Sequence, residues 1–205
     1  ETWWEYAATT RTLTVSGTGA MPDFANADAQ PWKDVRNEIE KVKIEAGVTS
    51  VGAYAFRNSA ALTSVTLAEG VQTIGKAAFN DCKKLTDIIL PEGVQTIGES
   101  AFSNCEKLPS ITIPKSVTTI GEQAFFYCYA LGGVTVEWTE ARFIPNLPAS
   151  AFSIVPNAKV LHVPVGTAEM YRAKDEWKKF FIMDGKTAGG RPRTVHGRTS
   201  GCHLR

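Results

Sequence analysis

The amino-acid sequence predicts a mainly β, right-handed solenoid with short helices, in which each coil of the chain stacks on the one before it. The pair Ala-Phe returns at intervals of 23, 23, 23 and 27 residues, and an apolar-x-apolar pair follows in step with it. The segments on either side lack this period. We therefore expect one domain over 1–185, with a β-rich N-terminal cap at 1–40, repeats at 41–164 and a helical C-terminal cap at 165–185.

The first 40 residues predict a β-hairpin followed by a helical segment. Apolar and polar residues alternate at 3–6 and 13–16, with a short connection between them. Trp32, Val35 and Ile39 then follow Pro31 at helical spacing, and proline is favoured at the first position of a helix. These elements would close the first end of the solenoid.

The repeats comprise about five 23-residue units, a period within the leucine-rich-repeat range. The apolar-x-apolar pairs predict six parallel strands, near 41–45, 64–68, 87–91, 110–114, 133–137 and 160–164. Stacking of equivalent positions would place the phenylalanines of the Ala-Phe pairs in one buried column, formed by Phe56, Phe79, Phe102, Phe125 and Phe152. The last unit is four residues longer, and the extra residues fall within 137–143.

The segment after the repeats predicts an amphipathic helix. Thr167 is a suitable N-cap, and apolar residues return at helical spacing behind it. One face would carry Met170, Tyr171, Lys174, Trp177 and Phe181. This helix would close the second end of the solenoid.

The repeat unit Gly-Val-x-x-Ile-Gly-x-x-Ala-Phe-x-x-Cys-x-x-Leu-x-x-Ile-x-Ile-Pro resembles the BspA-like leucine-rich repeat of bacterial surface proteins. The stretches Leu13–Pro22 and Val163–Gly166 are similar to the caps of that family. The resemblance covers about 1–185. It implies a secreted or cell-surface protein with an export signal before Glu1, a role in adhesion and host-protein binding, and no shared catalytic residues.

Charge and hydropathy exclude two classes of partner. The net charge of +1 gives no support to nucleic-acid binding, and no apolar run reaches the ~18 residues of a membrane helix. Residues 186–205 hold five basic residues and no acidic one. We expect a disordered basic tail there, either a linker or an appended non-native extension, and a tail of this kind could bind anions.

No motif predicts an enzyme, a cofactor or a metal site. Cys82, Cys105 and Cys128 are 23 residues apart and should stack in one inward column, as buried reduced thiols rather than metal ligands. His162 is expected on the surface, with no nucleophile motif near it. Metal capture by Cys202 with the two histidines of the tail has little support.

Six residues form the candidate partner-binding site. Aromatic residues cluster in the fourth and fifth units, where earlier units carry polar residues. Exposed aromatic side chains commonly anchor protein interfaces, whereas the alternative is that the extra residues and the C-terminal helix cover these rings. The site comprises Phe126, Tyr127, Tyr129 and Trp138, and extends onto Thr135 and His162.

Three functions remain open on the sequence alone. The first is a non-catalytic surface module that binds a host or neighbouring protein. The second is a structural spacer that displays other domains, and a glycan binder is a more distant third. A face of six strands has an area below ~400 Å², about half of what one partner of a standard interface buries. Tight binding would therefore need additional surface or avidity. The oligomeric state is not encoded in these patterns.

Overall fold

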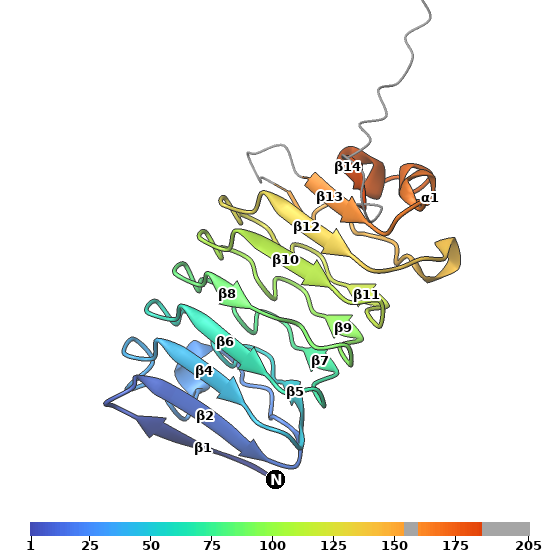
Figure 1. Ribbon diagram of the computed structural model, residues 1–205. Helices are drawn as coiled ribbons and strands as arrows, with labels where there is room; N and C mark the ends of the chain where they lie inside the picture. The colour runs from blue at the N-terminus through green and yellow to red at the C-terminus, as the bar shows by residue number, and fades with distance from the viewer. Residues whose placement is uncertain (154–159, 186–205) are drawn as a thin grey trace, which may run out of the picture.

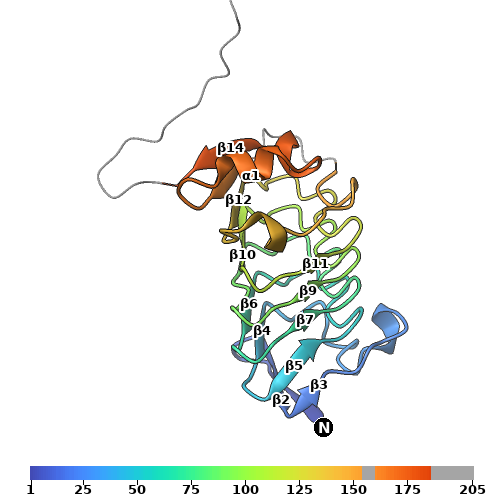
Figure 2. The ribbon, with the colours of Figure 1, turned by 90° about the vertical axis from the view of Figure 1, so that its right-hand side faces the viewer.

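The computed structural model describes residues 1–153 and 160–185 of the chain. The predicted basic tail at 186–205 and residues 154–159 of the last repeat lie outside the described residues. The chain forms a solenoid whose successive coils stack along one axis (Figures 1 and 2). The mainly β solenoid predicted from the repeat is therefore confirmed.

One side of the solenoid, the strand face, is built from two sheets that lie side by side (Figure 1). All strand pairs are parallel except the antiparallel pair β1–β2. The first sheet has the order β1 (Thr2–Ala7), β2 (Thr12–Gly17), β4 (Lys41–Ile44), β6 (Ser64–Leu67) and β8 (Asp87–Ile88). The second has the order β10 (Ser110–Ile113), β12 (Gly133–Val136), β13 (Val160–Val163) and β14 (Phe181–Asp184).

The six strands expected on this face are present, although β8 is shorter than predicted. A proline explains where the two sheets separate. Thr63 and Thr86 each donate their backbone N–H to the preceding coil, at 2.8 and 2.9 Å. The equivalent residue of the next coil is Pro109, which has no N–H to donate. The ladder between β8 and β10 is interrupted at this point.

A third sheet, which the sequence pattern did not predict, forms another side of the coils (Figure 2). Its parallel strands are β3 (Gly19–Ala20), β5 (Val48–Val51), β7 (Thr73–Ile74), β9 (Thr96–Ile97) and β11 (Thr119–Ile120), in the order β11-β9-β7-β5-β3. Glycines follow these strands because neighbouring coils approach closely. A Cβ at Gly121 would lie 2.4 Å from Glu99 N.

The predicted phenylalanine column runs through the core. Its five rings are stacked, with centroids 4.8–5.4 Å apart and interplanar angles of 7–12°. Beside it, Cys82, Cys105 and Cys128 are fully buried, and each thiol donates to the carbonyl oxygen of a phenylalanine in the preceding coil, at 3.1–3.3 Å. Burial raises the pKa of the Cys82 and Cys105 thiols well above its usual range. The expectation of buried, reduced thiols is confirmed.

The third side of each coil contains left-handed residues that are not glycine. Asn58, Asp81 and Asn104 occupy one column with φ of 60–63°. Each donates its backbone N–H to the next coil, at 2.8–2.9 Å. Asparagine and aspartate tolerate this conformation better than other residues with a side chain. Residues in this column must therefore adopt a left-handed φ, which favours asparagine and aspartate there.

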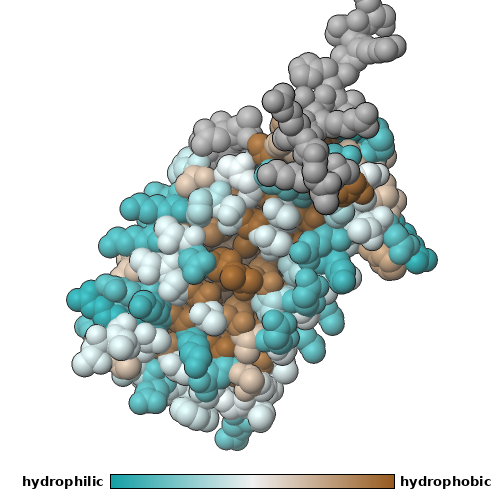
Figure 3. All heavy atoms as spheres, in the orientation of Figure 1, coloured by the Kyte–Doolittle hydropathy of each residue, from teal (hydrophilic) through white to brown (hydrophobic). Residues whose placement is uncertain are grey.

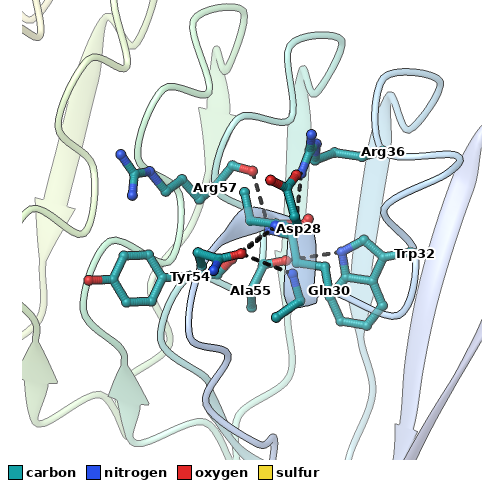
Figure 4. A network of polar contacts seen from close by, with 10 residues as sticks. Asp28, Gln30, Trp32, Arg36, Tyr54, Ala55 and Arg57 are labelled. Carbon is teal, nitrogen blue, oxygen red and sulfur yellow. Dashed lines mark hydrogen bonds and ion pairs between the residues drawn. The ribbon is translucent and has the colours of Figure 1, made fainter.

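The N-terminal segment lies against the first coil through polar and aromatic contacts (Figure 4). Trp32 stacks on Phe56 at 5.3 Å, and its indole N–H donates to the Ala55 carbonyl at 3.0 Å. The buried Gln30 amide donates to the carbonyl oxygens of Tyr54 and Arg57. The predicted hairpin is present as β1 and β2. Residues 31–38 form successive turns and no α-helix, and the short 3₁₀ helix η1 (Ala27–Ala29) precedes them.

The predicted C-terminal helix is wrong beyond its first turns. The helix α1 (Ala168–Arg172) is followed by the 3₁₀ helix η3 (Trp177–Lys179), and the chain then enters β14. Phe181 pairs with Val160 as a strand residue and is 54% exposed. The gain from pairing with β13, whose edge would otherwise be open, outweighs the local helical pattern. Tyr171, Trp177 and Phe180 are buried at this end of the core.

Candidate binding surface

Three of the predicted aromatic residues form one cluster on the coil that precedes β12. The ring centroids of Phe126 and Tyr127 are 4.1 Å apart, and those of Tyr127 and Tyr129 are 5.5 Å apart. Phe126 and Tyr127 are half-buried, and Tyr129 is 41% exposed. Equivalent positions one coil earlier hold Ser103, Asn104 and Glu106. The aromatic cluster of Phe126, Tyr127 and Tyr129 therefore replaces a polar surface.

Tyr127 adopts a backbone conformation that does not suit tyrosine. Its φ is +56°, in the column where Asn58, Asp81 and Asn104 have almost the same value. A left-handed residue other than glycine costs about 1–3 kcal/mol, and the cost is least for asparagine and aspartate. The ring is only half-buried, so burial in the core does not explain why tyrosine occupies this position.

Trp138 does not belong to this surface, which corrects the prediction from sequence. Its side chain is 1% exposed, and its indole N–H donates to the Val117 carbonyl at 3.1 Å. The Tyr171 hydroxyl donates to the Trp138 carbonyl at 2.7 Å, and the Trp177 ring lies 5.8 Å away. The C-terminal segment covers Trp138, as the alternative interpretation of the aromatic residues expected. It is a core residue at that end of the solenoid.

Thr135 and His162 lie side by side on the strand face, paired across β12 and β13. Thr135 is half-buried and His162 is exposed. The His162 ring leans over Gly133, where an added Cβ would be 3.8 Å from His162 Nε2. Because Gly133 begins β12, the ring lies toward the first residue of that strand. The predicted residues thus form an aromatic cluster and a separate strand-face pair.

The strand face is larger and more apolar than the sequence analysis expected. Apolar residues gather along its middle, between hydrophilic flanks (Figure 3). Ile89 is 75% exposed at the break between β8 and β10, in a column that holds threonine at positions 66, 112 and 135. Since β1, β2 and β14 extend the face to nine strands, its area is about 600 Å². This remains below the ~800 Å² of a standard interface.

The residues inserted after β12 add a recess that sequence reasoning missed. This segment includes η2 (Ala141–Phe143) and projects beyond the neighbouring turns (Figure 1). It frames a cavity of about 280 Å³ lined in part by Lys115, Glu137 and Phe143. Burial, and then the neighbouring Glu92 carboxyl, raise the pKa of Glu137, while Lys115 opposes the shift. The only sequence signal for this recess was the departure from the 23-residue period.

Residues 1–153 and 160–185 contain no group of three or more histidine, cysteine or acidic side chains placed to hold a metal ion. No helix within the same two ranges has the length and apolar character required to cross a bilayer.

Known proteins with a similar repeat were then compared with this chain. The family model for the BspA-type leucine-rich repeat region matches residues 35–157 in six copies. A leucine-rich repeat protein from Eubacterium ventriosum is 31% identical, with a TM-score of 0.50, over 62% of this chain and 40% of that one. A leucine-rich cell-surface protein from Faecalibacterium prausnitzii is 25% identical, with a TM-score of 0.50, over 79% of this chain and 46% of that one.

A third solved structure, the pneumococcal vaccine antigen PcpA, is 21% identical with a TM-score of 0.57, over 72% of this chain and 42% of that one, and shows the fold alone. A search of curated proteins found no match. The chain spans less than half the length of the first two solved relatives. The family model, in contrast, covers more than half of this chain in the register of its coils. The chain therefore belongs to the BspA-type leucine-rich repeat family.

Proposed function

We propose that this chain is a non-catalytic protein-binding module of a bacterial cell surface. It contacts a host or neighbouring protein through the aromatic cluster and the adjacent part of the strand face around Thr135 and His162. Proteins of the leucine-rich repeat fold generally mediate protein interactions. The Faecalibacterium relative is described as a cell-surface protein and the pneumococcal neighbour as a vaccine antigen, which supports display outside the cell.

The observation that carries the proposal is the presence of tyrosine at position 127, in a left-handed column where earlier coils carry asparagine or aspartate. Asparagine at this position would relieve the strain, as Asn58 and Asn104 do in earlier coils. The chain instead carries tyrosine, whose ring contacts those of Phe126 and Tyr129 at the surface. The left-handed φ itself recurs in the coils, at Tyr54, Ala77, Ser100 and Gln123 in a second column. What supports a binding role is therefore the choice of tyrosine over asparagine at this half-buried surface position. Large rings with few rotatable bonds are efficient interface anchors.

The neighbouring charges give the cluster a defined border. Lys83 and Glu106 occupy the same column as Tyr129 in the two preceding coils, and their ion pair measures 3.0 Å. Both side chains are partly exposed, so the pair contributes little to stability. It forms the polar rim that commonly surrounds an apolar contact centre.

The test is a binding screen of the chain against purified host matrix proteins and a glycan array, followed by substitution. Tyr127→Asn should raise the melting temperature and weaken binding at least tenfold, since an anchor residue contributes ≥2 kcal/mol. Tyr129→Ala should weaken binding with no change in melting temperature. Phe143→Ala, which removes an exposed aromatic ring outside the cluster, is the matched control and should bind normally. A chain ending at residue 185 controls for attraction by the basic residues beyond it.

Full affinity in both tyrosine variants would contradict the proposed site. The spacer alternative is favoured by the limited area of the strand face, which stays below that of a standard interface. A spacer would give no hit in the screen that depends on the aromatic cluster. Binding to the array alone, lost in Tyr129→Ala, would instead indicate glycan recognition by ring stacking.

A further inference from the structure

The N-terminal edge of the strand face is a six-residue strand that pairs on its outer side with no other strand of residues 1–153 and 160–185. β1 is the outermost strand of its sheet and lies at the end of the solenoid in both ribbon views (Figures 1 and 2). Its sequence, Thr-Trp-Trp-Glu-Tyr-Ala, contains neither proline nor lysine, the residues that commonly protect such edges. Trp3 is 59% exposed and Trp4 is 40% exposed.

The hydrogen bonds of the hairpin establish which backbone groups of β1 face outward. Glu1 and Thr18 exchange two backbone hydrogen bonds, of 3.1 and 3.2 Å. Paired residues of an antiparallel ladder alternate between hydrogen-bonded and non-hydrogen-bonded pairs. Trp3 and Glu5 therefore bond to β2, whereas Thr2, Trp4 and Tyr6 direct their N–H and C=O groups away from it.

We propose that a second copy of this chain pairs with β1 in antiparallel orientation, with Trp4 opposite Trp4 of the other copy. In this register Thr2 pairs with Tyr6 of the other copy and Tyr6 with its Thr2. All three outward-facing residues then form hydrogen-bonded pairs across a two-fold axis. The arrangement uses the same surface on both copies, as a two-fold dimer requires.

Charge selects this register over its neighbours. With Trp4 on the axis, Glu5 lies opposite Trp3 and the strands bring no like charges together. A register centred on Glu5 places the two carboxylates opposite one another, which is destabilising. A register centred on Trp3 brings Glu1 opposite Glu5, which also places like charges together. Of these three registers, only the one centred on Trp4 pairs Thr2, Trp4 and Tyr6 without charge repulsion.

The side chains support the same partner. Trp4 contacts Trp32 at 6.0 Å and lines, with Phe24 and Met21, an apolar recess of about 80 Å³ at the end of the core. The Trp4 ring of the second copy would lie beside this recess. Two partly exposed tryptophans and one strand edge give an interface well below the ~800 Å² of a standard one. We therefore expect a weak dimer that forms only as concentration rises.

The experiment reads the register directly by single cysteine substitutions at positions 3, 4 and 5 of the full chain, each in a Cys202→Ser background. Residues directly opposite in an antiparallel pair have Cα atoms about 5.5 Å or less apart, within disulfide range. Trp4→Cys should form an interchain disulfide under mild oxidation at high concentration. Trp3→Cys and Glu5→Cys should form far less. Predominant cross-linking at position 3 or 5, or at none, would overturn the proposed pairing.

Sedimentation of the unmodified chain over a range of concentrations provides the second measurement. Thr2→Pro removes one outward N–H per copy without touching a bond to β2, and edge strands tolerate proline. It should weaken the dimer about tenfold, because two hydrogen bonds disappear across the axis. Trp3→Lys places its charge beside Glu5 of the other copy and should retain the dimer. A chain that stays monomeric at every concentration would refute the inference.

Discussion

Truncation of a central phenylalanine tests the stacked core most directly. Phe102 is fully buried, and its ring centroid lies 5.4 Å from those of both Phe79 and Phe125. Backbone bonds set the spacing of the coils, including one of 2.8 Å from Phe102 N–H to the Ala124 carbonyl. The cavity left by Phe102→Ala cannot close by moving one coil alone. We expect a loss near the upper end of the ~3–5 kcal/mol range for such truncations.

The assay is urea unfolding followed by circular dichroism, with the midpoint and slope fitted for each variant. Phe102→Leu fills most of the space and should lose clearly less than the alanine variant. Ile89→Thr, a surface change to the residue of neighbouring coils, should stay within about 0.5 kcal/mol of the parent. A loss below ~1.5 kcal/mol for Phe102→Ala, at an unchanged slope, would refute the view that the stack is a rigid column.

Three further changes test other contacts. Ser59→Ala should raise the unfolding free energy by about 1 kcal/mol, because the fully buried Ser59 hydroxyl has no hydrogen-bond partner within residues 1–153 and 160–185. Gly121→Ala should cost about 1–3 kcal/mol, whereas Gly70→Ala, whose added Cβ would meet only Val48 O at 3.6 Å, should be neutral in thermal unfolding. Burial, and then the Glu92 carboxyl, raise the pKa of Glu137. The folded state therefore binds the proton of the Glu137 carboxyl more tightly than the unfolded state does. The free energy of unfolding should fall as pH rises from the unfolded-state pKa of 4.5 through the folded-state pKa. Glu137→Gln should flatten that part of a stability curve measured against pH.

The period of the sequence predicted the elements that repeat. The phenylalanine column, the buried thiols and the six strands follow from equivalent positions in stacked coils, because each coil must bury the same side against its neighbour. The hairpin was also predictable, since alternation at 3–6 and 13–16 is a local signal. In these cases local pattern and tertiary packing favour the same structure.

The sheet formed by β3, β5, β7, β9 and β11 and the C-terminal strand β14 could not be predicted in the same way. β7, β9 and β11 are two residues long, too short for alternation to distinguish a strand from a turn. Their strand geometry comes from pairing between coils. β14 has a helical pattern before it and becomes a strand because β13 offers an open edge. Both structures depend on contacts between residues distant in sequence.

Aromatic residues that depart from the repeat do not all lie on the surface of the candidate site. Tyr129 and Trp138 are both aromatic residues at positions where the period predicts another residue. The sequence alone does not distinguish which of the two side chains is exposed. One ring is 41% exposed and the other 1% exposed. Trp138 is buried because Tyr171 and Trp177 pack over it from the C-terminal segment. An aromatic residue out of register can anchor a partner or close the end of the core, and only the path of the following chain distinguishes the two.

The β1 edge and the aromatic cluster lie far enough apart that dimerisation would leave the cluster of each copy free to bind a ligand. Six strand steps of about 4.8 Å separate β1 from β12, so the aromatic cluster stands roughly 30 Å from the dimer edge. A dimer joined through β1 would carry two ligand surfaces, one on each side of the axis. Both could engage a densely displayed partner, and the second contact would become intramolecular. We expect tighter binding to an immobilised ligand than to the same ligand in solution. Trp4→Lys, which sets two like charges on the axis, should abolish this difference and leave the affinity in solution unchanged. An equal loss in both formats would show that β1 contacts the ligand itself.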